Sequence, residues 1–208
     1  MSDPTSIEGQ IVAGARGAFT PEWLAEALAS MPSMKAYWVA LSGGADSVAL
    51  LHALCQLREA LAPTEIGAIH VHHGLHRLAD GWERECRRLC AQLEVALQVR
   101  RVDGRAACGE SPEAAARRAR YDALASVLGA GEAVCTAHHE RDQAETLLLQ
   151  LLRGAGPAGL AAMPTVAPLG KGWLARPLLD ASPAGLRDYL GRHGVAWLED
   201  PGNIDRFG

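Results

Sequence analysis

Two patterns of apolar residues alternate along this chain. Short, compact apolar runs are typical of buried strands, and apolar residues at three- or four-residue spacing are typical of helices. The apolar runs predict strands at residues 37–41, 66–72, 97–102, 133–137 and 173–178. The helical spacing predicts helices at residues 21–31, 50–61, 82–93, 111–128, 142–152 and 183–193. Strands and helices therefore alternate through most of the sequence.

This alternation is typical of a parallel sheet with both faces covered. We predict a doubly wound α/β fold with a mostly parallel five-stranded sheet and helices on both faces. Residues 1–20 are expected to be an extension, and residues 21–208 the domain. Residues 153–172 break the rhythm, because they are rich in Gly, Pro and Ala. So long a connection is expected to be a lid, a binding loop or a passive surface loop.

Composition agrees with an ordinary globular domain, since 49% of the 208 residues are apolar and 21% are charged. No run of 18 apolar residues and no secretory signal pattern is present, which predicts a cytoplasmic location and no membrane association. The five cysteines are odd in number and form no C-x-x-C pair; they are Cys55, Cys86, Cys90, Cys108 and Cys135. We expect buried, reduced thiols, with Cys86 and Cys90 packing on a helix rather than binding metal.

The net charge of −4 argues against simple electrostatic capture of nucleic acid. The charge is uneven, however, because residues 77–120 hold ten arginines and seven acids, a balance of +3. An arginine-biased face of this kind is suited to phosphates. Alternatively, arginine is simply the preferred cation of this chain, which contains only two lysines, Lys35 and Lys171.

A glycine pair follows the first predicted strand and precedes a helix. The segment reads Ser42, Gly43, Gly44, Ala45, Asp46 and Ser47. Glycines let the backbone approach an anion, and the N–H groups at a helix start favour phosphate. The serines add hydroxyl donors, and Asp46 is suited to hold Mg²⁺. The loop lacks the lysine of a Walker motif, so it suits a pyrophosphate leaving group; the plain alternative is a helix-capping turn.

The pattern S-G-G-x-D-S after a strand resembles the PP-loop ATPases, which split ATP into AMP and pyrophosphate. Further stretches, in the same order, resemble the tRNA(Ile)-lysidine synthases. They occupy residues 69–75, 113–121, 137–146, 153–160, 176–179 and 199–201. The resemblance covers residues 39–208.

The resemblance implies a PP-loop fold with ATP across the carboxyl ends of the strands. It also implies a ligase. ATP activates carbon 2 of the wobble cytidine in an isoleucine tRNA with a CAU anticodon, and the ε-amine of L-lysine displaces AMP. The implied cofactors are ATP and Mg²⁺, and the partners are tRNA and lysine. The oligomeric state is left open, with a homodimer as one option.

Site residues follow from the same resemblance. The implied catalytic residues are Asp46, Arg117, Asp142 and Glu145. ATP is expected to contact residues 42–47 and His72, with Asp46 as the metal ligand. Lysine is expected at Asp142 and Glu145, and the further candidates are His138, His139 and Arg120. One departure is Arg141, because the family commonly has an acidic or amide residue there.

The residues themselves leave plainer interpretations open. Asp142 and Glu145 share a helix face by their spacing, but they could also complement the helix start and contact solvent. The apolar residues of that helix are predicted to form a core-facing stripe, namely Ala144, Leu147, Leu148 and Leu151. Arg117 and Arg120 also share a face, which alone is usually a solvated one. A histidine pair such as His138 and His139 is more often structural than catalytic.

Two other functions compete with the ligase. One is a tRNA thiolase, which would need active-site cysteines; the other is a non-catalytic nucleotide-binding module. The sequence ends without turn chemistry that would finish a domain, so we expect an N-terminal fragment of a longer protein. Such a fragment is expected to bind ATP, and to bind tRNA only weakly and in a salt-sensitive way.

Overall fold

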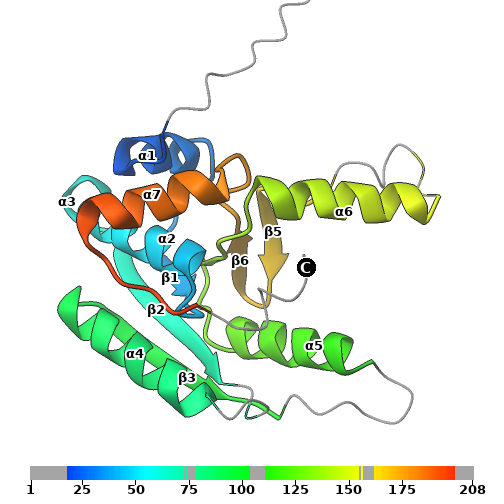
Figure 1. Cartoon of the computed structure of the whole chain (residues 1–208), viewed down its shortest axis with the longest axis horizontal. Helices are drawn as coiled ribbons and strands as arrows, with labels where there is room; N and C mark the ends of the chain where they lie inside the picture. Colours follow the sequence, from blue (N-terminus) through cyan, green and yellow to red (C-terminus); the bar gives the residue numbers. More distant parts are fainter. Residues whose placement is uncertain are drawn as a thin grey trace, which may run out of the picture.

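The computed structural model describes residues 18–72, 74, 78–103, 111–154, 156 and 162–199 (Figure 1). Within these ranges the strands are β1 (Ala36–Ala40), β2 (Glu65–His72), β3 (Ala96–Arg101), β4 (Glu132–Cys135), β5 (Val166–Leu169) and β6 (Gly172–Ala175). The helices are α1 (Pro21–Ala29), α2 (Ala45–Gln56), α3 (Arg58–Leu61), α4 (Ala79–Gln92), α5 (Pro112–Ala125), α6 (Glu140–Leu152) and α7 (Pro183–His193).

The strands form one six-stranded sheet in the order β3-β2-β1-β4-β6-β5. Every neighbouring pair is parallel except β5 and β6, which pair antiparallel. The mostly parallel α/β fold is confirmed, but the predicted count of five strands is wrong. The additional strand is β5, which lies inside the stretch predicted to be a loop, residues 153–172. It has four residues, includes Pro168 and lies at the sheet edge, so its sequence carries little strand signal.

Both faces of the sheet are covered. Successive residues of a strand point to opposite faces, so neighbouring residues of β1 belong to different cores. Tyr37 and Val39 of β1 belong to the larger core, which also contains buried residues of α1, α2, α4 and α7. Trp38 and Ala40 pack against a second, smaller core, to which α5 contributes Leu124. Figure 1 shows α1, α2 and α7 stacked together. The doubly wound arrangement is therefore confirmed.

Helix α6 departs from the expected packing. None of its residues is buried, and Leu148, Leu151 and Leu152 are 59%, 51% and 83% exposed. Figure 1 shows the helix extending away from the body of the sheet. The predicted core-facing stripe of Ala144, Leu147, Leu148 and Leu151 is therefore wrong. The apolar spacing is present, but no described element buries it.

The cysteines behave as expected where they are described. Cys86, Cys90 and Cys135 are buried and Cys55 is half-buried, and all four are free thiols. Cys108 lies outside the described residues. Burial raises the pKa of Cys86 and Cys135 to about 12 and that of Cys90 to about 11, so these thiols stay protonated. No helix in the described ranges is long and apolar enough to cross a membrane.

Candidate nucleotide-binding site

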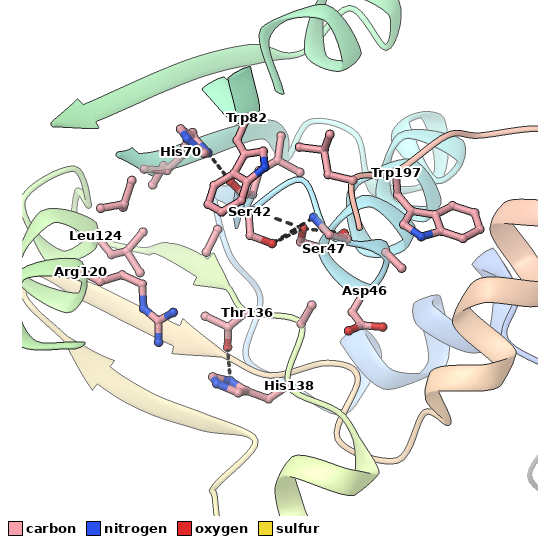
Figure 2. Close-up of a pocket in the computed structure, with 18 of the residues that line it drawn as sticks. Ser42, Asp46, Ser47, His70, Trp82, Arg120, Leu124, Thr136, His138 and Trp197 are labelled. Atoms are coloured by element: carbon pink, nitrogen blue, oxygen red, sulfur yellow. Dashed lines mark hydrogen bonds between the residues drawn. The ribbon is translucent and has the colours of Figure 1, made fainter. Parts of the chain in front are cut away.

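The strand order reverses beside β1, where β2 lies on one side and β4 on the other. Ligands of open α/β sheets bind at such a switch point, outside the carboxyl ends of the strands. A cavity of about 590 Å³ lies there, which is a volume typical of small-molecule sites (Figure 2). Its walls come from the segments that follow β1 and β4, the end of β2, α4, α5, α7 and residues 197–199.

The glycine pair sits at the strand–helix junction, as predicted. Gly44 is the N-cap residue of α2, and no side chain of the described residues caps this end. The first-turn N–H groups and the positive end of the helix dipole are therefore directed at the cavity. The Ser47 hydroxyl donates to the Gly44 carbonyl (3.0 Å) and accepts from the Ser42 N–H (3.2 Å). These contacts hold the loop in shape and make its helix start a suitable place for phosphate.

Gly43 adopts a φ of +92°, a conformation that residues with a side chain rarely take. Its carbonyl accepts a hydrogen bond from the Leu198 N–H (2.9 Å). A Cβ atom on Gly43 would lie 2.6 Å from Leu198 Cδ1. The segment after α7 therefore packs directly on the phosphate loop, and this contact requires glycine.

Asp46 carries an oxygen that has no hydrogen-bond partner among the described residues. Its Oδ1 atom is buried and has no hydrogen bond among the described residues, while Oδ2 lies 3.6 Å from His139 Nε2. Burial raises the pKa of Asp46, whereas the positive charges of His139 and Arg187 lower it. A buried, unpaired carboxylate oxygen next to a phosphate-binding helix start fits a hard cation such as Mg²⁺. The residues present therefore fit the metal that the sequence implied.

His138 and Thr136 face the cavity from the end of β4 (Figure 2). The Thr136 hydroxyl and His138 Nδ1 are 2.9 Å apart. Burial lowers the pKa of His138 to about 4, and Arg176, Arg120 and Arg117 add to this while Asp142 opposes it. The imidazole is therefore neutral near pH 7 and can take part in hydrogen bonds without carrying a charge.

Arg117 and Arg120 both lie over the ring of Tyr121, at 5.0 Å and 5.6 Å from its centroid. Arg120 also lines the cavity, together with Tyr121, whereas Arg117 is exposed beside it. The Tyr121 hydroxyl is buried and has no hydrogen bond within the described residues. The predicted shared face thus delivers one guanidinium into the cavity and holds the second next to it.

The predicted lysine-binding pair lies at the start of α6. Asp142 Oδ2 accepts a hydrogen bond from the His139 N–H (2.8 Å) and lies 3.2 Å from His139 Nδ1. This is a capping interaction, so the plainer interpretation of Asp142 describes a contact that is present. Glu145 is exposed, as is Arg141, and neither Asp142 nor Glu145 lines the cavity. The ring of His139 lies between the two carboxylates, with Nδ1 3.2 Å from Asp142 Oδ2 and Nε2 3.6 Å from Asp46 Oδ2, although Nδ1 forms no hydrogen bond among the described residues.

The histidine predicted to contact ATP does not line the cavity. His72 Nδ1 accepts from the Gly74 N–H (3.2 Å), so its Nε2 carries the proton and donates to Asp80 (3.1 Å). His70, two residues earlier, lines the cavity instead. Its Nδ1 donates to the Leu41 carbonyl (2.8 Å), which leaves Nε2 as an acceptor. The structure therefore places His70, and not His72, among the residues that line the cavity.

Several lining residues were not predicted as site residues. They are Trp82, Thr136, Arg187, Trp197 and Leu198, with His70 and Glu199, which lie in the motif stretches 69–75 and 199–201. A search for motifs would not find Arg187 or Trp82, because each is one polar or aromatic position on an ordinary helix. Parts of three motifs fall outside the described residues, namely 73 and 75, 155 and 157–160, and 200–201.

A doubly wound sheet, a glycine-rich loop at a helix start and a cavity at the switch point together define a nucleotide-binding α/β protein. The chain belongs to the PP-loop family, whose domain matches residues 22–207.

Sequence relatives narrow the comparison. The chain is 51% identical to the tRNA(Ile)-lysidine synthase of Methylococcus capsulatus over 169 residues, which are 81% of this chain and 38% of that protein. It is 50% identical to the enzyme of the same name from Pseudomonas aeruginosa over 182 residues, which are 88% of this chain and 41% of that protein. The chain thus spans about two fifths of the length of these curated relatives.

Solved structures support the fold alone. A U34-tRNA thiolase from Methanococcus maripaludis aligns with a TM-score of 0.71 at 14% identity, over 87% of this chain and 65% of that chain. An NH3-dependent NAD synthetase from Campylobacter jejuni aligns with a TM-score of 0.51 at 16% identity, over 84% of this chain and 70% of that chain.

Proposed function

We propose that this chain provides the catalytic domain of an ATP-dependent ligase that joins L-lysine to carbon 2 of the wobble cytidine in an isoleucine tRNA. AMP and pyrophosphate are the other products. The observation that carries the proposal is one cavity at which four features converge. They are the phosphate loop, the Asp46 carboxylate, the Arg120 guanidinium and the neutral His138. About 50% identity to proteins named tRNA(Ile)-lysidine synthase supports the choice of substrate.

In the first step, the cytosine O2 atom attacks the α-phosphorus of ATP and the bond to pyrophosphate breaks. The N–H groups at the start of α2 and the Ser42 and Ser47 hydroxyls would bind the phosphates. Asp46 would hold Mg²⁺, which supplies countercharge to them. Arg120 would stabilise negative charge at the phosphate, with Arg117 beside it.

In the second step, the lysine ε-amine attacks carbon 2, and AMP leaves with the former O2 atom. The amine must lose its proton to act as a nucleophile. His138 is neutral and faces the cavity, so its imidazole would accept a hydrogen bond from the amine, but its lowered pKa makes it a weak base and the proton would pass to solvent. Asp142 and Glu145 would hold the ammonium group as lysine enters, since both carboxylates lie on the helix that begins beside His138 and His139.

The thiolase alternative requires a reactive cysteine at the cavity. None of the four described cysteines lines it. Three of them have pKa values raised to about 11 or 12, so their thiolate forms are scarce at neutral pH. The chemistry of these thiols therefore favours the ligase.

Pyrophosphate release tests the proposal directly. The purified chain would be incubated with ATP, Mg²⁺ and the isoleucine tRNA, with and without lysine, and in parallel with a sulfur donor. We expect pyrophosphate to be released when tRNA is present. When lysine is also present, we expect lysine-modified tRNA as the product. Release that needs the sulfur donor instead would favour a thiolase. ATP binding without any release would favour a non-catalytic nucleotide-binding module.

A further inference from the structure

Helix α7 is held rigidly against α2, the helix that begins at the phosphate loop. Leu186, Tyr189 and Leu190 are buried. The Tyr189 hydroxyl is 2.7 Å from His52 Nδ1 on α2, and both side chains are buried. Ser182 caps the start of α7 by accepting from the Gly185 N–H (3.0 Å). An exposed side chain at the edge of this buried face is therefore presented to the cavity from a fixed support.

Arg187 occupies that position at the edge of the buried face. It is exposed, and it lines the same cavity as Ser42, Ser47 and Asp46. Within the described residues it forms no hydrogen bond or ion pair. Its guanidinium is therefore available to an anionic ligand.

The charges around the phosphate loop leave a role for such a cation. Asp46 and Glu199 both line the cavity, and both repel phosphate. Arg120 and Arg187 are the cationic lining residues that the structure describes, and Figure 2 places Arg120 at the far side of the cavity from Asp46. Neither lysine of the chain lines the cavity. Without Arg187, a phosphate group at the loop would thus meet one guanidinium and two carboxylates.

We propose that Arg187 binds the β- and γ-phosphates of ATP, and so the leaving pyrophosphate. Its guanidinium replaces, from α7, the lysine that the loop itself lacks. The inference rests on the proposed function, because it assigns a further residue to the same ATP site. A guanidinium can contact two phosphate oxygens at once, which would hold the β- and γ-phosphates near Asp46 and its metal.

Calorimetric titration of the whole chain with ATP, pyrophosphate and AMP, in the presence of Mg²⁺, tests this assignment. The variants are Arg187→Ala, Arg187→Lys and the control Arg88→Ala. Arg88 is an exposed cation on α4, paired with Glu85 at 2.8 Å, so its loss changes the net charge equally. We expect Arg187→Ala to weaken ATP and pyrophosphate binding about tenfold, or about 1.4 kcal/mol. AMP binding should not change, because AMP lacks both outer phosphates.

Arg187→Lys should recover part of the affinity, since it restores the charge but not the two-pronged contact. Unchanged affinity of Arg187→Ala for ATP and pyrophosphate would overturn the assignment. An equal loss for AMP, or an equal loss in Arg88→Ala, would also overturn it. A wild-type chain that binds neither ATP nor pyrophosphate would instead refute the proposed function. The two failures are therefore distinguishable.

Discussion

Replacing Gly43 by alanine should disturb both the stability of the chain and its affinity for ATP. Two physical effects combine at this position. The residue has a φ of +92°, and its new Cβ would lie 2.6 Å from Leu198 Cδ1 and 3.5 Å from Cys86 Sγ. The first effect strains the backbone of the phosphate loop. The second pushes away the segment whose Leu198 N–H donates to the Gly43 carbonyl.

The magnitude follows from these two contributions. A non-glycine residue in a sparsely populated backbone region costs about 1–3 kcal/mol. Forcing one extra carbon into a packed contact typically costs about 1–3 kcal/mol more. The side chain of Leu198 is only half-buried, so part of the second cost is relieved by its movement. We therefore expect Gly43→Ala to lower the free energy of unfolding by about 2–5 kcal/mol.

Urea denaturation and ATP titration measure the two consequences. Gly194→Ala is a matched control, because Gly194 has a φ of +63° but no atom within 4 Å of the position that an added Cβ would take. It should cost only the backbone contribution, about 1–2 kcal/mol, and leave ATP affinity unchanged. The double variant Gly43→Ala with Leu198→Ala should recover the steric part, as a positive coupling in a double-mutant cycle.

The reasoning would be refuted by either of two results. If Gly43→Ala and Gly194→Ala cost the same and both bind ATP normally, the contact with Leu198 has no energetic weight. If the Leu198→Ala change adds to the cost of Gly43→Ala without any recovery, the crowding is not the cause of the loss.

Three further predictions concern individual site groups. Asp46→Asn should reduce Mg²⁺-dependent pyrophosphate release at least about a hundredfold, and near-normal release would contradict the metal role. Glu145→Gln should raise the KM for lysine about tenfold with little change for ATP, whereas equal effects would count against lysine binding. Burial lowers the pKa of His138 to about 4, below the unfolded value of 6.5. The unfolded chain then binds more protons between these values, so the free energy of unfolding should fall as pH drops from about 6.5 towards 4. In His138→Gln, the urea midpoint of unfolding should fall less steeply over the same pH range. An unchanged pH dependence would contradict the role of His138.

Much of the fold could be predicted from the sequence, because the patterns that indicate strands, helices and turns are local. The apolar runs and helical spacing place β1 to β4 and the helices between them, and the glycine pair marks the turn into α2. The order of strands and helices then leaves few topologies, since parallel connections cross over a sheet face with one hand. The phosphate loop could be predicted for the same reason. Its contacts run between Ser42, Gly44 and Ser47, which are near neighbours in the chain.

Only the tertiary structure shows which residues pack against each motif that the sequence predicts. Helix α6 has an apolar spacing, yet its leucines remain exposed, because periodicity gives a face and not its partner. His70 and His72 share one side of β2, but only the distance of each from the loop determines which one lines the cavity. Arg187 and Leu198 reach the phosphate loop from more than 140 residues away along the chain, roughly the length of a whole small domain. No sequence pattern encodes such contacts, because they depend on how α7 packs on α2. The sequence by itself therefore determined the nucleotide-binding framework, while packing selected the side chains that complete the site.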